Sequence, residues 1–186
     1  SFNIGTGLDD IVWSLGVQLD RKPIPGGRYS LVDGNDVLSA SRLNADGVYD
    51  STFAIGVGVE GDVFAVAVQS DGGIVIGGDF KKVAGVVAKN IARLNPDGTL
   101  DSTFAVGSGS DQPVRDIAIQ DDGKLVVVGE FGILADASLG KVGRLNPDGS
   151  ADADFSPGMG ANGIVHSVGI QQDGGIIIAG EFTTVN

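Results

Sequence analysis

The sequence predicts an all-β fold built from repeated units, and three observations support this prediction. Runs rich in β-branched residues alternate with turn-forming residues, and no stretch shows sustained helical periodicity. The 31 glycines against 6 prolines are typical of a chain with many tight turns. Several residue types also recur with a fixed step of 51 residues. The phenylalanines that keep this step are Phe2, Phe53, Phe104 and Phe155.

The repeat organises the whole chain as a single repeat domain. Glutamine, aspartate and aromatic series keep the same step as the phenylalanines, so the register does not depend on one residue type. We therefore expect three full units and a partial fourth. Their bounds are 1–50, 51–101, 102–152 and 153–186.

Each unit is expected to form four short antiparallel strands. Asp-Gly turns separate the first strand from the second and the third from the fourth, which places both turns on one face of the array. The loops on the opposite face vary more between units, and binding sites are usually placed on such loops. The strands expected in unit two are Val63–Gln69, Gly73–Phe80, Asn90–Asn95 and a stretch around Leu100–Ala105.

The hexapeptide RLNPDG predicts the turn between the third and fourth strands. It occurs at Arg93–Gly98 and again at Arg144–Gly149. Its asparagine can accept backbone hydrogen bonds, its proline fixes φ, and its glycine takes the left-handed conformation that rejoins the ladder. We therefore expect a structural role, and no catalytic one, for the turn residues Asp97, Gly98, Asp148 and Gly149.

The first strand of unit two has two unlike faces. Alternation along the strand places Ala65 and Ala67 on one side and Phe64, Val66 and Val68 on the other. A sheet with a small face and a large face can stack on copies of itself, large into small. Radial stacking of four-stranded antiparallel blades in units of about 40–50 residues is the β-propeller arrangement. A linear β-solenoid is the alternative, although its coils are usually shorter.

The repeat also resembles a known family. The stretch AVQSDGGIVIGGDF, followed by NIARLNPDGTLDSTF, is similar to the delta-60 repeat family of β-propellers, and the resemblance covers nearly all of the chain. That family recurs in large bacterial secreted or surface proteins and in phage-associated proteins. The resemblance implies a scaffold or interaction role, and it brings no catalytic residues with it.

Unit one departs from the pattern. Pro23 and Pro25 stand in the places of Ile74 and Ile76, so one side of its second strand lacks two backbone donors. We expect an atypical terminal unit of the kind that repeat arrays often carry. Because 186 residues cover fewer than four full repeats, we also expect no self-sufficient closed monomer. The chain would be a segment of a longer polypeptide, or part of an assembly in which neighbouring copies cover the open ends.

Acids recur at the end of the second strand, at Asp79, Glu130 and Glu181, and arginines recur in the third strand of units two and three. The acids follow a glycine, and they lie at the same offset from the connecting loop as the arginines. This spacing predicts cross-strand ion pairs of about 0.2–1 kcal/mol each. The expected pairs are Asp79 with Arg93 and Glu130 with Arg144.

Unit one lacks the acid of this pair. Arg28 stands at the acid position and Arg42 at the arginine position, so the two would repel each other. We expect its hairpin to be rearranged, or to use another acid such as Asp33 or Asp36.

The position that opens the first strand differs in every unit. It holds Trp13, Phe64, Arg115 and His166, near the expected mouth of a central channel on the variable face. An aromatic pair beside an arginine and a histidine could contact a sugar or a peptide. The alternative is ordinary packing between units with two tolerated polar substitutions. His166 is the only histidine, and no Ser/His/Asp or paired-carboxylate arrangement follows from the spacing.

The composition excludes several classes of function. A net charge of −12 and a pI near 4.2 disfavour nucleic-acid binding. The absence of cysteine excludes disulfides, and no apolar run approaches the ~20 residues of a membrane-spanning helix. Acids in the glycine-rich loops could hold Ca²⁺, but they have neither EF-hand nor RTX spacing, so we expect no metal and no cofactor. These acids are Asp9, Asp10, Glu60, Asp62 and Asp111.

The sequence thus favours a non-catalytic scaffold for protein–protein interaction, adhesion or assembly. The expected host is an extracellular, cell-surface or virion structural protein, and the expected partners are other proteins or copies of the same chain. A carbohydrate-binding, lectin-like propeller is one alternative, with a cell-surface glycan as its ligand. A propeller hydrolase or lyase is another, for which Arg115, His166 and Asp116 are the available polar residues.

Overall fold

The fold is described by a computed structural model that covers residues 5–158 and 160–185 of the chain. Every regular element within these residues is a β-strand, so the prediction of an all-β fold is confirmed. Phe2, the first residue of the phenylalanine series, lies outside the described residues.

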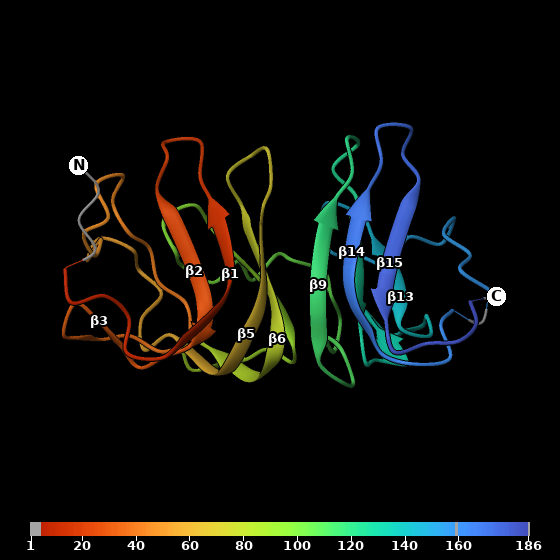
Figure 1. Ribbon diagram of the computed structural model, residues 1–186, viewed down its shortest axis with the longest axis horizontal. Coiled ribbons are helices and arrows are strands. Elements are labelled where there is room, and N and C mark those ends of the chain that lie inside the picture. The colour runs from red at the N-terminus through yellow and green to blue at the C-terminus, as the bar shows by residue number, and fades with distance from the viewer. Residues whose placement is uncertain (1–4, 159, 186) are drawn as a thin grey trace.

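The longer strands pair antiparallel within each unit (Figure 1). The first two strands of every unit form a hairpin, and in units two and three another strand joins the outer side of the second. Units one and two contain β1 (Ile11–Val17), β2 (Pro23–Arg28), β5 (Val59–Val68), β6 (Ile74–Val83) and β8 (Ile91–Leu94). Units three and four contain β9 (Val114–Ile119), β10 (Leu125–Gly129), β13 (Val142–Leu145), β14 (Val165–Ile170) and β15 (Ile176–Gly180).

Short strands occupy the loops that follow the second strand of each of the first three units. In units one and three they form two-residue hairpins, and in unit two the loop strand pairs with the extended end of β6. They are β3 (Leu31–Val32), β4 (Asn35–Asp36), β7 (Val86–Val87), β11 (Ile133–Leu134) and β12 (Ala137–Ser138).

The fourth strand of the unit is much shorter than the sequence predicts. In unit two a single bridge joins Leu94 to Leu100. The Asp101 carboxylate then accepts hydrogen bonds from the backbone N–H of Thr103 at 2.8 Å and from its hydroxyl at 2.6 Å. This local turn directs the chain out of the ladder, because the side chain offers the backbone an alternative partner. Unit two still has a four-stranded sheet, but the extra strand is β7 from the loop.

Unit one is atypical, as its prolines predict. The backbone N–H of Leu43 donates to the carbonyl of Pro23 at 2.8 Å, but Pro23 has no N–H with which to return the bond. The same holds for Ser41 and Pro25, whose bond measures 3.4 Å. Instead of a third strand, this region makes only isolated bridges such as Gly26 with Ala40.

The sheets stack large face into small face, as predicted. A Cβ added at Gly16 of unit one would lie 2.7 Å from Cγ1 of Val66, and one added at Gly26 would lie 2.6 Å from its Cγ2. Between units two and three, Val114 approaches Gly77 in the same way, at 2.5 Å from the added Cβ. Small residues on one unit therefore make room for the branched side chains of the next.

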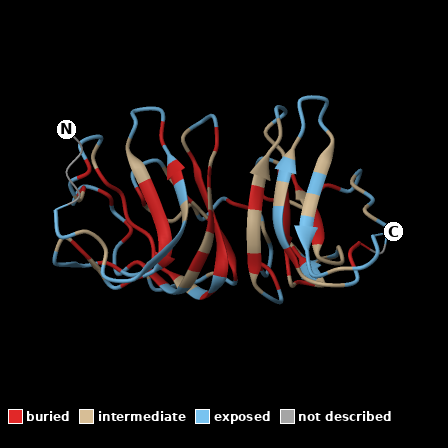
Figure 2. Cartoon of the chain, viewed as in Figure 1, coloured by how far each residue is buried: buried red, intermediate tan, exposed pale blue. Residues whose placement is uncertain are grey.

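The hydrophobic core lies between units rather than within one of them. Three clusters fill the successive interfaces: Ile24 packs in the first with Ile76, Val75 in the second with Leu125, and Val126 in the third with Val165. The buried residues accordingly concentrate in the inner sheets of the array (Figure 2). Each unit depends on its neighbours for burial, which is the physical basis of a repeat array.

The array is open across the described residues. Extensive contacts join the first two strands of a unit to the first strand of the next, from β1 and β2 through β5 and β9 to β14. Comparable contacts between the β1–β2 hairpin and the β14–β15 hairpin are absent from this part of the chain. These two hairpins belong to the units at opposite ends of the array (Figure 1).

Candidate functional site

The four residues that open the first strands converge on one depression. Trp13, Phe64, Arg115 and His166 line it together with Asp62, and its volume is about 360 Å³. They come from four different units, on β1, β5, β9 and β14. The structure thus brings together all four residues that the sequence singled out as ligand-binding candidates.

A β-bulge in each unit places these side chains at the depression. The pairing between the first and second strands shifts register once in this region of every unit, and each shift falls at one of the four residues. A bulge leaves one residue unpaired and re-aims its side chain, and bulges are frequent beside functional sites. The bulged residues are Trp13, Phe64, Arg115 and His166.

A glycine on the second strand makes each bulge possible. A Cβ at Gly78 would lie 2.0 Å from the carbonyl oxygen of Asp62, and one at Gly180 would lie 2.1 Å from that of Ile164. Gly27 and Gly129 are equally confined by backbone oxygens. The glycine that precedes the recurring acid is therefore the sequence signal of the bulge.

Aromatic and cationic side chains stack along the depression. The rings of Trp13 and Phe64 meet edge to face, with centroids 4.9 Å apart and an interplanar angle of 75°. The guanidinium carbon of Arg115 lies 4.6 Å from the Phe64 ring centroid, and that of Arg28 lies 5.8 Å from the Trp13 ring. These are favourable geometries for aromatic and cation–π contacts, and they fix the orientation of the two rings.

Arg115 and His166 each pair with the acid that follows the second strand of their own unit. Arg115 Nε donates to Glu130 Oε1 at 2.8 Å, and His166 Nε2 lies 2.9 Å from Glu181 Oε1. Unit one exchanges the roles, because its bulged residue is Trp13 and the cation is Arg28 on the second strand. The two positions, 15 residues apart, thus form one cross-strand pair whose chemistry changes from unit to unit.

The ion pairs predicted between the second and third strands are wrong. In the β6–β8 register Arg93 lies opposite Val75, and Asp79 is four residues further along β6, too far for contact. In the β10–β13 register Arg144 likewise lies opposite Val126, away from Glu130. The connecting loop is not symmetric about its midpoint, so equal offsets in sequence did not give facing residues.

The acids expected for unit one are also different from those observed. Arg28 Nε lies 3.3 Å from Asp10 Oδ2 at the exposed end of the hairpin. Arg42 Nε lies 2.9 Å from Asp50 Oδ2, and Lys22 Nζ lies at the same distance from that oxygen. Neither Asp33 nor Asp36 takes part in an ion pair within the described residues.

The arginines of RLN instead lock one unit to the next. Arg93 Nε donates to Asp101 Oδ2 at 2.7 Å, and its Nη1 donates to the carbonyl oxygen of Pro147 in the following unit at 2.8 Å. Its guanidinium carbon also lies 4.9 Å from the Phe104 ring centroid. Gln69 adds a second bond to the Pro147 carbonyl, at 3.2 Å. We call this arrangement the turn lock.

The turn lock occurs in the same form between units one and two. Arg42 donates to Pro96 O at 2.8 Å, Gln18 donates to the same oxygen at 3.1 Å, and the Arg42 guanidinium lies 4.9 Å from the Phe53 ring. In unit three, Arg144 pairs with Asp152 at 2.6 Å and stacks over Phe155 at 4.8 Å. The recurrence of RLNPDG thus reflects contact between units as well as the hairpin turn.

The predicted geometry of the NPDG turn is confirmed. Gly98 has φ of 94° and donates its N–H to Asn95 O at 2.9 Å, and Gly149 has φ of 93°. Asp97 accepts bonds from the N–H and hydroxyl of Thr99 at 3.0 and 2.7 Å, which lowers the pKa of its carboxyl. The structural role of Asp148 is the same, with Ser150 as the donor.

Asp62 is the least satisfied charge at the depression. Burial raises the pKa of its carboxyl above the ordinary value, and nearby Asp79 and Asp10 add to the shift while Arg28 opposes it. Acids therefore outnumber free cations around the aromatic pair, and the site disfavours an anionic ligand.

Asp116 does not line the depression. Its Oδ2 accepts bonds from the Ser167 hydroxyl and from the Val168 N–H, both at 2.9 Å, and so joins β9 to β14. Of the polar residues available to a propeller enzyme, only Arg115 and His166 reach the depression.

The acids of the glycine-rich loops brace neighbouring loops. Asp9 accepts the N–H groups of Ser30 and Leu31 at 2.8 and 2.9 Å, and these bonds lower the pKa of its carboxyl, with that from Leu31 contributing most. Asp111 accepts the N–H groups of Gly132 and Ile133 in the same manner. Within residues 5–158 and 160–185, no cluster of three or more His, Asp or Glu side chains is placed to hold a metal ion.

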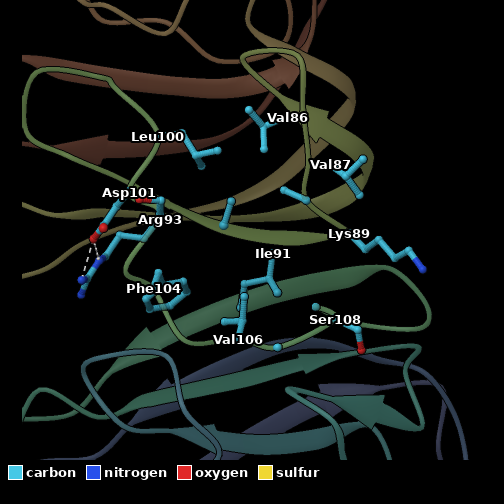
Figure 3. A pocket seen from close by; sticks show the side chains of 15 residues that line it. Val86, Val87, Lys89, Ile91, Arg93, Leu100, Asp101, Phe104, Val106 and Ser108 are labelled. Atoms are coloured by element: carbon cyan, nitrogen blue, oxygen red, sulfur yellow. Dashed lines mark hydrogen bonds and ion pairs between the residues drawn. The ribbon is translucent and has the colours of Figure 1, made fainter.

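A second depression of about 420 Å³ lies where the loop and third strand of unit two meet the first residues of unit three (Figure 3). Val86, Val87, Leu100 and Phe104 contribute to its largely apolar lining, and the Arg93–Asp101 pair lies at one end. The loop tip is 54% exposed at Val86 and 70% exposed at Val87.

Two stretches of the chain match the family model described as "Domain of unknown function (DUF5122) beta-propeller". The matched residues are 69–104 and 120–155, and each stretch runs from the first Asp-Gly turn through the turn lock to the phenylalanine. These are β-propeller-type repeats. The matches fall in units two and three, where the sheets are most regular.

Solved structures provide further comparisons. A protein of unknown function from Bacteroides caccae is 13% identical, with a TM-score of 0.48; the alignment covers 90% of this chain and 52% of that one. The extracellular domain of the putative one component system BT4673 from B. thetaiotaomicron is 10% identical, with a TM-score of 0.25 and coverage of 90% and 34%. This chain thus spans about half or less of either chain's length. No curated protein matches. The described residues contain no helix long and apolar enough to cross a membrane.

Proposed function

We propose that this β-propeller-type repeat chain is a non-catalytic binding scaffold, and that the depression at the four bulges is its ligand site. The supporting observation is the convergence of four chemically different side chains, one from each unit, on a single depression. A position that only had to pack would carry similar residues in every unit, as the turn-lock phenylalanines do. The bulges hold these side chains at the surface, while the rest of each sheet is committed to packing.

The charges at the depression favour binding over catalysis. Arg115 is held by Glu130, and the His166 ring by Glu181, so both polar side chains already have a carboxylate partner. Trp13 is 41% exposed and offers an aromatic surface beside these pairs. A rigid aromatic residue framed by paired charges is a common anchor for a protein segment. The excess of acids favours a peptide with a cationic side chain over an acidic one.

The host is proposed to be an extracellular bacterial protein or a virion structural protein. This part of the proposal rests on the resemblance of the repeat to the delta-60 family. The role of such a module would be adhesion or assembly through protein partners.

Trp13 also favours a carbohydrate as the second candidate ligand. An exposed indole can stack on a sugar ring, and the carboxylates of Glu130 and Glu181 could accept bonds from its hydroxyl groups. This alternative requires no change in the location of the site.

The intrinsic fluorescence of the protein tests both candidates, because Trp13 is the only tryptophan. A peptide library displayed on phage and a glycan array are the probes, and hits are titrated while Trp13 emission is followed. We expect basic peptides to shift the emission, and Arg115→Glu and His166→Glu variants to bind them differently from the parent. Asp121→Ala, in the turn after β9, is the control that should bind as the parent does.

Two results would overturn the proposal. One is that neither library yields a ligand. The other is that hits bind without changing Trp13 emission and are insensitive to both substitutions at the bulges. Hits from the glycan array alone, with the same dependence on Trp13 and Arg115, would select the carbohydrate reading.

A further inference from the structure

The last unit exposes a face that is buried in every other unit. Ile24, Val75 and Val126 occupy the same position in units one to three and are 0% exposed, whereas Ile177 of unit four is 55% exposed. All five residues of β10 are buried, but none of β15 is (Figure 2). The small face of unit four is therefore a mainly apolar sheet face that nothing covers within the described residues.

The first unit exposes the opposite face. Leu15 is 59% and Val17 54% exposed on β1, whereas Ile117, at the position of Leu15 in unit three, is 8% exposed. These side chains correspond to Val66 and Val68, which form the large face of unit two. The two ends of the array thus carry the two halves of the interface that joins its units.

The exposed faces at the two ends have the shapes that fit together at the interfaces between units. Val66 fills the space above Gly16, at 2.7 Å from an added Cβ. Gly169 is the same position in unit four, and an added Cβ there would meet nothing within 4 Å. A branched side chain such as Leu15 could occupy that space as Val66 does above Gly16.

Polar groups repeat the same complementarity. Ser14 Oγ accepts the N–H of Val66 at 3.0 Å, and Asp116 does the same for Val168 across the last internal interface. Gln18 and Gln69 donate to the turn carbonyls of the following unit. By the 51-residue step, Ser167 and Gln171 are the corresponding groups at the open end. Their counterparts on a following unit one would be the N–H of Leu15 and the carbonyl of Ala45.

We propose that two copies of this chain associate head to tail, the β1 face of each covering the β14–β15 face of the other. Both contacts continue the interface already formed three times within the chain, with Leu15 over Gly169 and Gln171 bonded to Ala45 O. Because each copy makes both contacts with the other, the proposed assembly is a closed ring of eight units, two of them partial, at the upper end of the usual range of about 4–8 blades. Association of this kind requires no ligand at the bulges.

Engineered disulfides test the register directly, because the chain has no cysteine. A chain carrying both Leu15→Cys and Gly169→Cys should form a covalent dimer under oxidation. Neither single variant should cross-link to itself, since in the proposed contact each position faces a different residue. The matched control is the internal pair Gly16→Cys with Val66→Cys, which should form an intramolecular bond and leave the covalent mass unchanged.

Sedimentation velocity gives the second measurement. The parent chain should sediment as one species of twice 18.8 kDa. Gly169→Leu fills the space meant for Leu15 and should reduce the mass to a monomer, while circular dichroism stays unchanged because the site is open. Val87→Leu, on the exposed tip of a loop, is the control and should leave the dimer intact.

Three outcomes would overturn the proposal. A monomer at every concentration would show that a second copy does not cover these faces. Cross-linking of Leu15→Cys to itself would indicate a symmetric contact instead of a head-to-tail one. A ladder of larger oligomers would show that the contact does not close after two copies.

Discussion

The two ends of each sheet differ in how far their residues recur from unit to unit. At the turn-lock end, an arginine, an aspartate and a phenylalanine recur at Arg93, Asp101 and Phe104 and at their equivalents, and the ion pair and the ring stack are the same in units one to three. At the bulge end, the four equivalent positions hold four different side chains. The turn lock crosses from one unit to the next, whereas the charge pairs of the bulge end stay within a unit.

The turn-lock end therefore stabilises the array, whereas the bulge end presents variable side chains at the surface. Because the turn lock and the apolar faces bind the units together, the bulged residues are free to vary without loss of the fold. The ion pair of the turn lock is also more buried than that of the bulge end. The side chains of Arg93 and Asp101 are 15% and 11% exposed. Those of Arg28 and Asp10 are 56% and 44% exposed. Substitutions at the turn lock should therefore change stability, and substitutions at the bulges should change binding.

The largest effect is expected from Arg93→Ala. The substitution leaves the Asp101 carboxylate and the Pro147 carbonyl without a cation, and it removes the stack on Phe104. Loss of one partner from a largely buried pair should lower the free energy of unfolding by about 3 kcal/mol. Urea unfolding followed by circular dichroism measures it.

Arg28→Ala is the matched control at the bulge end. Its pair with Asp10 is exposed, so the loss should stay below about 1 kcal/mol. Equal losses in the free energy of unfolding for Arg93→Ala and Arg28→Ala would contradict the view that the turn-lock end carries more of the stability.

Much of the fold could be predicted from the sequence, because the repeat multiplies every local signal by the number of units. The turn chemistry of NPDG, the alternation of Ala65 and Val66, and the prolines of unit one each specify backbone geometry directly. The fourth strand could not be predicted in this way. Asp101 redirects the backbone through Thr103, and a run of residues after a turn resembles a strand until that side-chain bond is known.

The residues of the candidate site could be selected from the sequence, but the bulges that bring them together could not. Trp13, Phe64, Arg115 and His166 stood out because they differ, but their convergence depends on bulges, which pairing registers reveal. The ion partners were missed because Arg93 pairs along its own chain with Asp101 and then across to Pro147. Spacing within one hairpin contains no information about a contact between units.

The next largest loss of stability is expected from an alanine substitution at a glycine of the turn lock. Gly149 and Gly174 both have positive φ, at 93° and 84°, so an alanine is strained by about 1 kcal/mol at either turn. A Cβ at Gly149 would also lie 2.7 Å from the Phe104 ring, whereas one at Gly174 meets nothing within 4 Å. Gly149→Ala should therefore lower the free energy of unfolding by about 1–3 kcal/mol more than Gly174→Ala, as measured in urea.

This prediction depends on packing between units. If the two alanine variants unfold at the same urea concentration, the Phe104 ring moves aside for the added Cβ without a measurable cost in stability. The lock would then rest on its polar bonds alone.

The two ends should also respond to pH with opposite signs. The ammonium of Lys124, with Arg144 beside it, lowers the pKa of the Asp152 carboxyl to about 2. Its contribution to stability is present above the unfolded pKa of about 4 and is lost as the pH falls through about 2. Burial raises the pKa of Asp62, so its ionisation lowers stability at neutral pH, and protonation on acidification removes that penalty.

Asparagine variants separate these two contributions. Asp152→Asn should lower stability at pH 7 and flatten the decline below about pH 4. Asp62→Asn should raise stability at pH 7 and leave that decline in place. Urea unfolding across the pH range is the measurement, and a loss of stability at pH 7 in Asp62→Asn would show that its charge is used at the depression.

The smallest effect is expected from Glu181→Gln at the bulge of unit four. Its pair with His166 is 71% exposed on the glutamate side and 45% on the histidine side, so solvent screens most of the attraction. The loss in the free energy of unfolding should stay below about 0.5 kcal/mol.

Glu130→Gln is the comparison variant, because it breaks the equivalent pair with Arg115, where the exposed fractions are only 25% and 32%. It should lower the free energy of unfolding by about 1 kcal/mol. Urea unfolding of the two variants side by side, with and without added salt, measures how much each pair contributes. An effect of Glu181→Gln as large as that of Arg93→Ala would mean that the bulge end also holds the array together, and that its side chains are not free to vary for binding.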